Sequence, residues 1–262
     1  MDGERVSATQ PTHLGGAYHI GLKRGDLPRY VLLPGDPERL SKIASTWSSS
    51  VQLAKRRQYV SIRGSYKGVD ISALSTGIGG PAVSIVVEEL AWLGVDTMIR
   101  VGSCGSVRED VKIGDIVITK AALRFDGASN AYAPPGFPAA ADPEVYLALV
   151  EAAGSLGVRY HTGLTATFDA FYVAQGRPGF KGYLPRTLRS WVEDMRSLNV
   201  VNVEMEGATL LTLTNLYGLR GGVVCSVFAN RVTDEFGEVG EIDAIMVANE
   251  AIRILEQGGP KR

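Results

Sequence analysis

The chain has 262 residues, of which 45% are hydrophobic and 21% charged, and its formal net charge is -1. This composition is typical of a soluble globular protein, and the near-neutral charge offers no basic surface for nucleic acid or an anionic membrane. Because the first residues contain no apolar signal segment and no uncharged apolar run approaches the ~20 residues of a membrane span, we expect a cytoplasmic protein.

Short β-rich runs alternate with amphipathic helices along the chain. In order, the sequence predicts a strand at 30–34, a helix at 35–45, a strand at 71–76, a helix at 82–94, strands at 97–102 and 115–120, a helix at 142–157, a strand at 200–204, a helix at 207–218, a strand at 221–230 and a helix at 241–257. Asp36 is expected to cap the first helix, with Pro37 in its first turn. This alternation favours an α/β fold around a largely parallel sheet. We expect residues 1–17 to form a flexible tail and residues 18–262 to form one domain.

Four predicted strands end in glycine or polar residues. Gly35 follows the first strand, Ser103 follows the strand at 97–102, and Glu204 ends the strand at 200–204. Asn230 ends the last strand, and Arg231 comes directly after it. Ligands of parallel α/β sheets bind at the carboxyl ends of the strands. The sequence therefore predicts a ligand site at this edge.

Gly35 and Arg39 belong to the segment PGDPERL, between a strand and a helix. A glycine at this position lets a ligand approach the backbone, and the first amides of a helix favour an anion. Arg39 in the first turn is unfavourable without such an anion. The alternative is a plain capping turn with a solvated arginine.

Arg100 lies inside an apolar strand, where a buried guanidinium needs an anionic partner. Ser103 could bind the same anion, and Arg57, in the segment AKRRQYV near the start of a strand, adds a third cation. Arginines grip phosphate in bidentate fashion, so these residues favour a phosphate site. The alternative for Arg100 is an internal ion pair with Glu88 or Glu89, and the alternative for Arg57 is a solvent-facing basic edge.

The segment FYVAQGR at 171–177 combines an aromatic ring, an amide and a cation. Phe171 could stack on a heterocyclic base, Gln175 could pair with its donor and acceptor groups, and Arg177 could donate to a carbonyl oxygen. The alternative is a surface loop with Phe171 in the core.

The run VNVEMEGATLL at 201–211 carries two carboxylates among apolar residues, which is costly without hydrogen-bond partners. One carboxylate can accept hydrogen bonds from both hydroxyls of a ribose, and Glu206 is at the mouth of a helix where it could do so. Met205 could line the sugar pocket, and Glu204 could orient other pocket side chains. Phosphate, ribose and base together indicate a nucleoside cleaved by phosphate.

The two cysteines, Cys104 and Cys225, are far apart, and the three histidines have no ligand spacing. A disulfide scaffold and a protein-held catalytic metal are therefore not expected.

Several long segments occur in an order that resembles the nucleoside phosphorylase I family, within which the chain is most similar to the enzymes that cleave uridine. They are HIGL (19–22), LPGDPERL (33–40), STGIGGPAVSIVVEEL (75–90), IRVGSCG (99–105), RFDGASNAYAP with FPAAAD (124–142), FYVAQGR (171–177), VEMEGATLL (203–211) and ANR (229–231). The resemblance implies a three-layer sandwich with a central mixed, largely parallel twisted sheet. It also implies reversible phosphorolysis of uridine, with possible use of deoxyuridine, to uracil and ribose 1-phosphate.

The resemblance also implies a role for each matching residue. It assigns phosphate binding to Gly35, Arg39, Arg57, Arg100 and Ser103; ribose binding to His19, Met205 and Glu206; and base binding to Phe171, Gln175, Arg177, Glu204 and Arg231. Within these sets, Arg100, Glu206 and Arg177 are the expected catalytic residues. His19 and Arg57 are expected to reach the site of a neighbouring subunit, in a homo-oligomer that is a hexamer built as a trimer of dimers.

The expected partners are a small-molecule nucleoside and phosphate, and no cofactor is expected besides phosphate as co-substrate. Gln58 replaces a glutamate that binds an intersubunit potassium ion in bacterial relatives, which argues against that ion here. The segment IRVGSCG, with Cys104, is similar to that of the purine nucleoside phosphorylases. Phe228 and Ala229 replace a bulkier aliphatic pair near the base, which changes the shape of the base pocket. A purine or broad-specificity phosphorylase therefore stays an alternative, followed by a nucleosidase and a non-catalytic nucleoside-binding protein.

Overall fold

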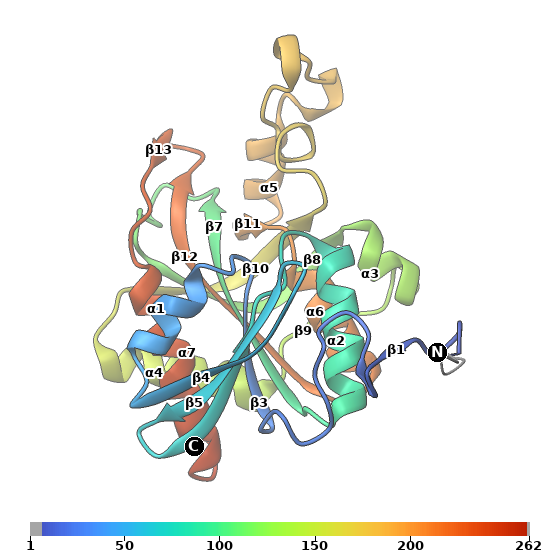
Figure 1. Cartoon of the computed structure of the whole chain (residues 1–262). Helices are drawn as coiled ribbons and strands as arrows, with labels where there is room; N and C mark the ends of the chain where they lie inside the picture. The colour runs from blue at the N-terminus through green and yellow to red at the C-terminus, as the bar shows by residue number, and fades with distance from the viewer. Residues whose placement is uncertain (1–6, 261–262) are drawn as a thin grey trace.

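The computed structural model describes residues 7–260. Its main feature is an eleven-stranded mixed sheet (Figure 1). The strands of this sheet are β3 (Tyr30–Pro34), β4 (Ser49–Arg56), β5 (Tyr59–Tyr66), β6 (Val69–Leu74), β7 (Thr97–Ser106), β8 (Ile116–Phe125), β9 (Ala139–Ala140), β10 (Tyr160–Phe168), β11 (Val200–Glu204), β12 (Arg220–Asn230) and β13 (Glu235–Phe236). Of the expected tail 1–17, residues 1–6 lie outside the described part, and β1 (Thr12–His13) and β2 (Gly16–Ala17) form a small antiparallel pair.

Helices cover both faces of the sheet. The helices are α1 (Arg39–Ser45), α2 (Gly80–Leu93), α3 (Gly127–Tyr132), α4 (Pro143–Leu156), α5 (Trp191–Ser197), α6 (Gly207–Leu216) and α7 (Glu241–Glu256), with 3-10 turns at Val173–Gln175, Phe180–Gly182 and Arg186–Leu188. In Figure 1, α1, α4 and α7 lie on one side, and α2, α3 and α6 lie on the other. The protein has two large hydrophobic cores. Ile99 of β7 packs in one core and its neighbour Met98 packs in the other, so this strand is buried on both faces.

Part of the sheet closes on itself. Parallel pairs join β7 to β12, β8 to β10 and β10 to β11, and antiparallel pairs join β12 to β8 and β11 to β7. These five strands complete a ring, while β3, β6, β5 and β4 continue from β7 as an open arm. The expected α/β class with a mixed sheet is confirmed. A simple three-layer sandwich is not, because a sheet that curls into a partly closed barrel does not form one flat layer.

The predicted elements are recovered with shifted ends. Asp142 caps α4 as its Oδ1 accepts from the amides of Glu144 and Val145 (both 3.0 Å). The expected cap at Asp36 is wrong: α1 begins at Arg39, and the Asp36 carboxylate instead accepts from the amide of Glu38 in the preceding turn (2.9 Å).

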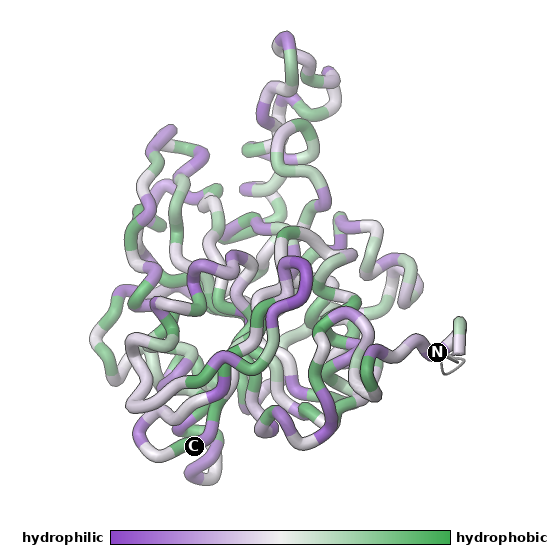
Figure 2. Tube along the Cα trace, viewed as in Figure 1, coloured by the Kyte–Doolittle hydropathy of each residue, from purple (hydrophilic) through white to green (hydrophobic). Residues whose placement is uncertain are grey.

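The antiparallel β4–β5 hairpin was not among the predicted elements, because β4 is exposed along most of its length and lacks an apolar face. Figure 2 shows a strongly hydrophilic stretch at the turn of this hairpin, where the sequence reads KRRQ. Among the described residues, no helix is both long and apolar enough to cross a membrane.

Candidate active site

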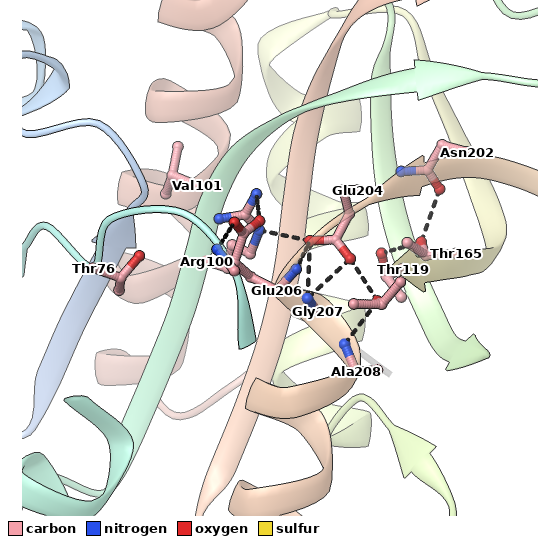
Figure 3. Close-up of polar contacts among 12 residues, drawn as sticks. Thr76, Arg100, Val101, Thr119, Thr165, Asn202, Glu204, Glu206, Gly207 and Ala208 are labelled. Atoms are coloured by element: carbon pink, nitrogen blue, oxygen red, sulfur yellow. Dashed lines mark hydrogen bonds and ion pairs between the residues drawn. The ribbon is translucent and has the colours of Figure 1, made fainter. Parts of the chain in front are cut away.

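Arg100 and two glutamates form a buried ion cluster at the carboxyl edge of the sheet (Figure 3). Nε of Arg100 donates to Oε2 of Glu204 (2.9 Å), and Nη2 lies 2.5 Å from Oε2 of Glu206. Burial opposes the charge on Arg100, but the carboxylates of Glu206 and Glu204 raise its pKa. The pair with Glu88 or Glu89 considered from the sequence is therefore not the one that forms.

The third nitrogen of Arg100, Nη1, is buried and has no hydrogen-bond partner among residues 7–260. A methyl group added to Gly35 would lie 3.8 Å from this nitrogen and 3.3 Å from the carbonyl oxygen of Gly77. The glycine turn after β3 therefore approaches the unpaired donor, and a buried unpaired donor is unfavourable unless a ligand accepts from it. This corner of the site suits an anion.

Glu204 braces the turn between β11 and α6. Its carboxylate accepts from the amides of Glu206 (2.9 Å) and Gly207 (2.8 and 2.9 Å) and from the Thr167 hydroxyl (2.6 Å). An anion at a helix N-terminus is favourable, so Glu204 is fully used in holding Arg100 and this turn. It does not lie in hydrogen-bonding contact with the base-side residues of segment 171–177.

Glu206 is the last residue before α6. Its Oε1 accepts from the amide of Gly79 at the start of α2 (2.6 Å), and its Oε2 meets Arg100. Burial raises the pKa of Glu206, with Arg100 acting in the opposite direction. Met205, which precedes Glu206, and Ser103, three residues after Arg100 on β7, are both half-buried. Both are therefore partly accessible to a ligand.

Arg39 lies on the first turn of α1 with 6% of its surface exposed. Its Nη1 donates to the carbonyl oxygen of Val101, which follows Arg100 in β7 (2.8 Å). Arg39 therefore contacts the backbone of the strand that carries Arg100, one residue beyond it.

A second cluster brings together residues that the sequence predicts to bind the base. Nη1 of Arg177 donates to the side-chain oxygen of Gln175 (2.6 Å) and to the carbonyl oxygen of Phe171 (2.8 Å), and its guanidinium lies 4.0 Å from the centre of the Phe171 ring. Arg231 donates to the carbonyl oxygen of Gln175 (2.8 Å). Phe171 is 48% exposed, so the alternative in which it is a core residue is wrong.

Arg177 and Arg231 donate hydrogen bonds to uncharged oxygens in this cluster. Burial and the nearby Arg231 lower the pKa of Arg177 to about 10, and burial lowers the pKa of Arg231. Nε2 of Gln175 is buried without a hydrogen-bond partner in the described part of the chain. The cluster therefore suits an electron-rich ligand that accepts hydrogen bonds.

The two residues expected to serve a neighbouring subunit lie apart from the ion cluster. Arg57 is exposed at the β4–β5 turn with a positive φ of 56°. His19 is tied to α2, because Glu89 accepts from its Nδ1 (2.7 Å) and its amide (2.9 Å). No contact joins either side chain to Arg100.

Three structural contributors were missed from the sequence: Glu89, Gly79 and Glu241, which hold His19, Glu206 and Arg39 respectively. Gly79 lies in the glycine-rich segment GIGGP before a predicted helix, and that segment is the sequence signal that could have marked a special turn. In the structure Gly79 has a positive φ of 93°. Glu89 and Glu241 are ordinary helical acids by pattern.

Comparisons with known proteins agree with this geometry. The family model described as Phosphorylase superfamily matches residues 29–256. Among similar curated proteins, the uridine phosphorylase of Thermococcus kodakarensis is 56% identical over 96% of this chain and 91% of its own. The uridine phosphorylase of Salmonella typhimurium is 42% identical over 91% of this chain and 97% of its own. The guanosine phosphorylase of Halorubrum lacusprofundi is 35% identical over 82% of this chain and 83% of its own.

The matched region contains both clusters, from the glycine turn at Gly35 to the start of α7. The order of the segments and the buried arginine with its two carboxylates agree with these matches. The chain belongs to the phosphorylase superfamily.

Proposed function

We propose that the protein is a uridine phosphorylase, which converts uridine and phosphate reversibly to uracil and ribose 1-phosphate. The observation that carries the proposal is the buried, unpaired Nη1 of Arg100 beside the Gly35 turn, a donor that phosphate would satisfy. The names of the relatives that are 56% and 42% identical over most of the chain support the same activity.

In this proposal, phosphate binds to Gly35, Arg39, Arg100 and Ser103 and attacks the anomeric carbon of the ribose. Arginine suits this role because its planar group offers several donors to one oxyanion. The transition state resembles an oxocarbenium ion, and the phosphate stabilises its positive charge. No side chain forms a covalent bond, so catalysis rests on positioning and electrostatics.

The ribose is proposed to lie against Met205 and Glu206, with the Glu206 carboxylate accepting from the 2′ and 3′ hydroxyls. An ionised carboxylate has about four lone-pair sites. Gly79 and Arg100 occupy two directions around Glu206, which leaves capacity for the two hydroxyls.

The uracil is proposed to bind at the second cluster, stacked near Phe171 and paired with Gln175. When the glycosidic bond breaks, negative charge collects on the departing base. Arg177 stabilises that charge, and the proximity of Arg231 strengthens the positive field. The free Nε2 of Gln175 supports this role, because a uracil carbonyl would accept from it.

We also propose that the active unit is at least a dimer, within a hexamer, in which Arg57 and His19 complete the neighbour's site. The exposure of Arg57 at a hairpin tip supports this, since it could reach across an interface. Arg57→Ala subunits and Arg100→Lys subunits should each use phosphate poorly, and mixing them should restore part of the activity at low phosphate. Failure of these mixtures to regain activity after subunit exchange would contradict shared sites.

Release of free base from uridine, with and without phosphate, tests the proposed reaction. Uracil formed only with phosphate, together with ribose 1-phosphate, is the expected result. Uracil release without phosphate would mean hydrolysis and would overturn the proposal.

A second candidate is purine phosphorolysis, favoured by the 35% identical guanosine phosphorylase and by Cys104 in the segment IRVGSCG, which resembles the purine nucleoside phosphorylases. Inosine and guanosine in the same assay separate the two. A kcat/KM for a purine nucleoside above that for uridine would replace the first candidate with the second.

A further inference from the structure

Arg39 is held from two sides. Its Nε donates to Oε1 of Glu241 (2.5 Å), and its Nη1 donates to the carbonyl oxygen of Val101 (2.8 Å). Glu241 comes from the far end of the chain, where it begins α7, whereas Val101 belongs to the central strand β7. The guanidinium is therefore fixed between a helix N-terminus and the strand that carries Arg100.

Glu241 is well suited to hold a cation. It is the first residue of α7, where the helix dipole favours a negative charge. Its side chain is only 14% exposed, and its second oxygen pairs with the ammonium of Lys42, which is about half exposed. Burial opposes ionisation of Glu241, but Lys42 and Arg39 lower its pKa below the ordinary value, so it is a carboxylate at neutral pH.

Arg39 and Arg100 share one pattern. Each guanidinium contacts fixed protein groups through two of its nitrogens. The third nitrogen of Arg100, Nη1, is buried without a hydrogen-bond partner among residues 7–260, and the hydrogen bonds of Arg39 to other described residues leave its Nη2 unused. A planar group fixed at two corners has its third corner fixed in direction as well.

Building on the proposed function, we propose that Glu241 is a positioning residue for the phosphate substrate. It acts through Arg39 and does not contact the phosphate itself. By holding Nε of Arg39, it orients the free Nη2 toward the phosphate next to Arg100. Without Glu241, Arg39 keeps one anchor, at Val101, and its long side chain regains rotational freedom that phosphate must then remove. The opposite idea, in which Glu241 competes with phosphate for Arg39, predicts tighter phosphate binding when Glu241 is removed.

Steady-state rates of Glu241→Ala, Glu241→Gln and the wild type, with phosphate and uridine varied in turn, test the role. We expect the KM for phosphate to rise roughly 10-fold to 10²-fold in Glu241→Ala, in line with the cost of a small misplacement. The KM for uridine should stay within twofold. Glu241→Gln keeps an oxygen acceptor for Nε and should recover part of the loss.

Lys42→Met is the matched control, because it removes the other partner of the same carboxylate and leaves the Arg39 contact in place. It should keep the wild-type KM for phosphate. A purely structural role would move both Michaelis constants and the melting temperature together, in Lys42→Met as in Glu241→Ala.

Inorganic phosphate alone provides a readout that does not require turnover. Phosphate should raise the melting temperature of the wild type, because it binds the folded state, and this rise should be lost in Glu241→Ala. An unchanged or lower KM for phosphate in folded Glu241→Ala, or an unchanged thermal shift, would overturn the positioning role. A wild type that binds phosphate but releases no base would instead overturn the proposed function, which distinguishes the two failures.

Discussion

Nη2 of Arg100 lies 2.5 Å from Oε2 of Glu206, and both side chains are almost completely buried. The same arginine also pairs with Glu204, so one largely buried cation faces two carboxylates. Removing one partner of such a cluster is more costly than never having built it, since the remaining charges stay buried.

Arg100→Met should therefore unfold the protein more easily, with a loss of about 3–5 kcal/mol in the free energy of unfolding. Thermal or urea denaturation measures the loss. Arg100→Lys keeps the positive charge and should recover most of the stability, but an ammonium cannot reproduce the three directions of the guanidinium. Its KM for phosphate should stay high, and a Lys variant with normal phosphate kinetics would contradict the proposed role of Nη1.

Glu206→Gln should retain the fold, because Arg100 keeps Glu204, and should lower kcat/KM for uridine by roughly 10²-fold or more. Circular dichroism and steady-state rates check the two halves of this expectation. A fully active Glu206→Gln variant would remove Glu206 from the ribose site.

The same residue sets a pH dependence. Burial raises the pKa of Glu206 above its ordinary value of 4.5, so the carboxylate gains its proton at a higher pH than an exposed glutamate. Protonation removes an acceptor for the ribose hydroxyls, so kcat/KM for uridine should fall on the acid side at a pH above 4.5.

Stability should move the other way in that window. A raised acid pKa means that the folded state binds the proton more tightly, so the cost of burying ionised Glu206 is relieved as the pH falls through its folded pKa. Activity lost while the protein stays folded is the expected signature. In Glu206→Gln the Glu206 limb should disappear, and any acid limb common to both proteins belongs to another titrating group.

Arg177→Ala should lower kcat more than it raises the KM for uridine, because its proposed partner is charge that develops only as the base departs. The matched variant Arg231→Gln leaves Arg177 in contact with Gln175 and removes the neighbouring cation. It should cost less. An effect of Arg177→Ala confined to KM would assign Arg177 to ground-state binding.

Gly102→Ala probes the space around the cluster. An added methyl group would lie 2.7 Å from Nη2 of Arg100 and 2.9 Å from Sγ of Cys225, so the guanidinium must shift. We expect a loss of about 1–3 kcal/mol in stability and a higher KM for phosphate. Gly154→Ala in α4 is the control, since its methyl group would meet nothing within 4 Å and should be neutral or stabilising.

Local signals predicted much of the fold. The Asp-Pro pair at Asp142 marks the start of α4, and the apolar strands 30–34 and 200–204 coincide with β3 and β11. The exposed strand β4 was missed, because no apolar periodicity distinguishes it. Closure of the sheet was missed too, since β11 meets β7 only through Asn202 and Val203, and two pairs leave no pattern in a sequence.

Site residues could be predicted where charged side chains lie in apolar segments. An arginine in an apolar strand and two acids in an apolar run pointed to Arg100, Glu204 and Glu206. What the sequence could not reveal was pairing at a distance. Glu241 meets Arg39 across a separation of 202 positions, and only the packing of α7 against the sheet brings them together.

The ring of strands also has a consequence for how the chain folds during its synthesis. Strand β7, which carries Arg100 and Ser103, needs β12 at Arg220–Asn230 as its lateral partner along its whole length. During synthesis β12 emerges long after β7, and pairing of strands that are distant in sequence is slow. Strand β7 with its Arg100 therefore lacks this neighbour until residues 220–230 have been made, so we expect a chain truncated before β12 to expose a charged strand edge.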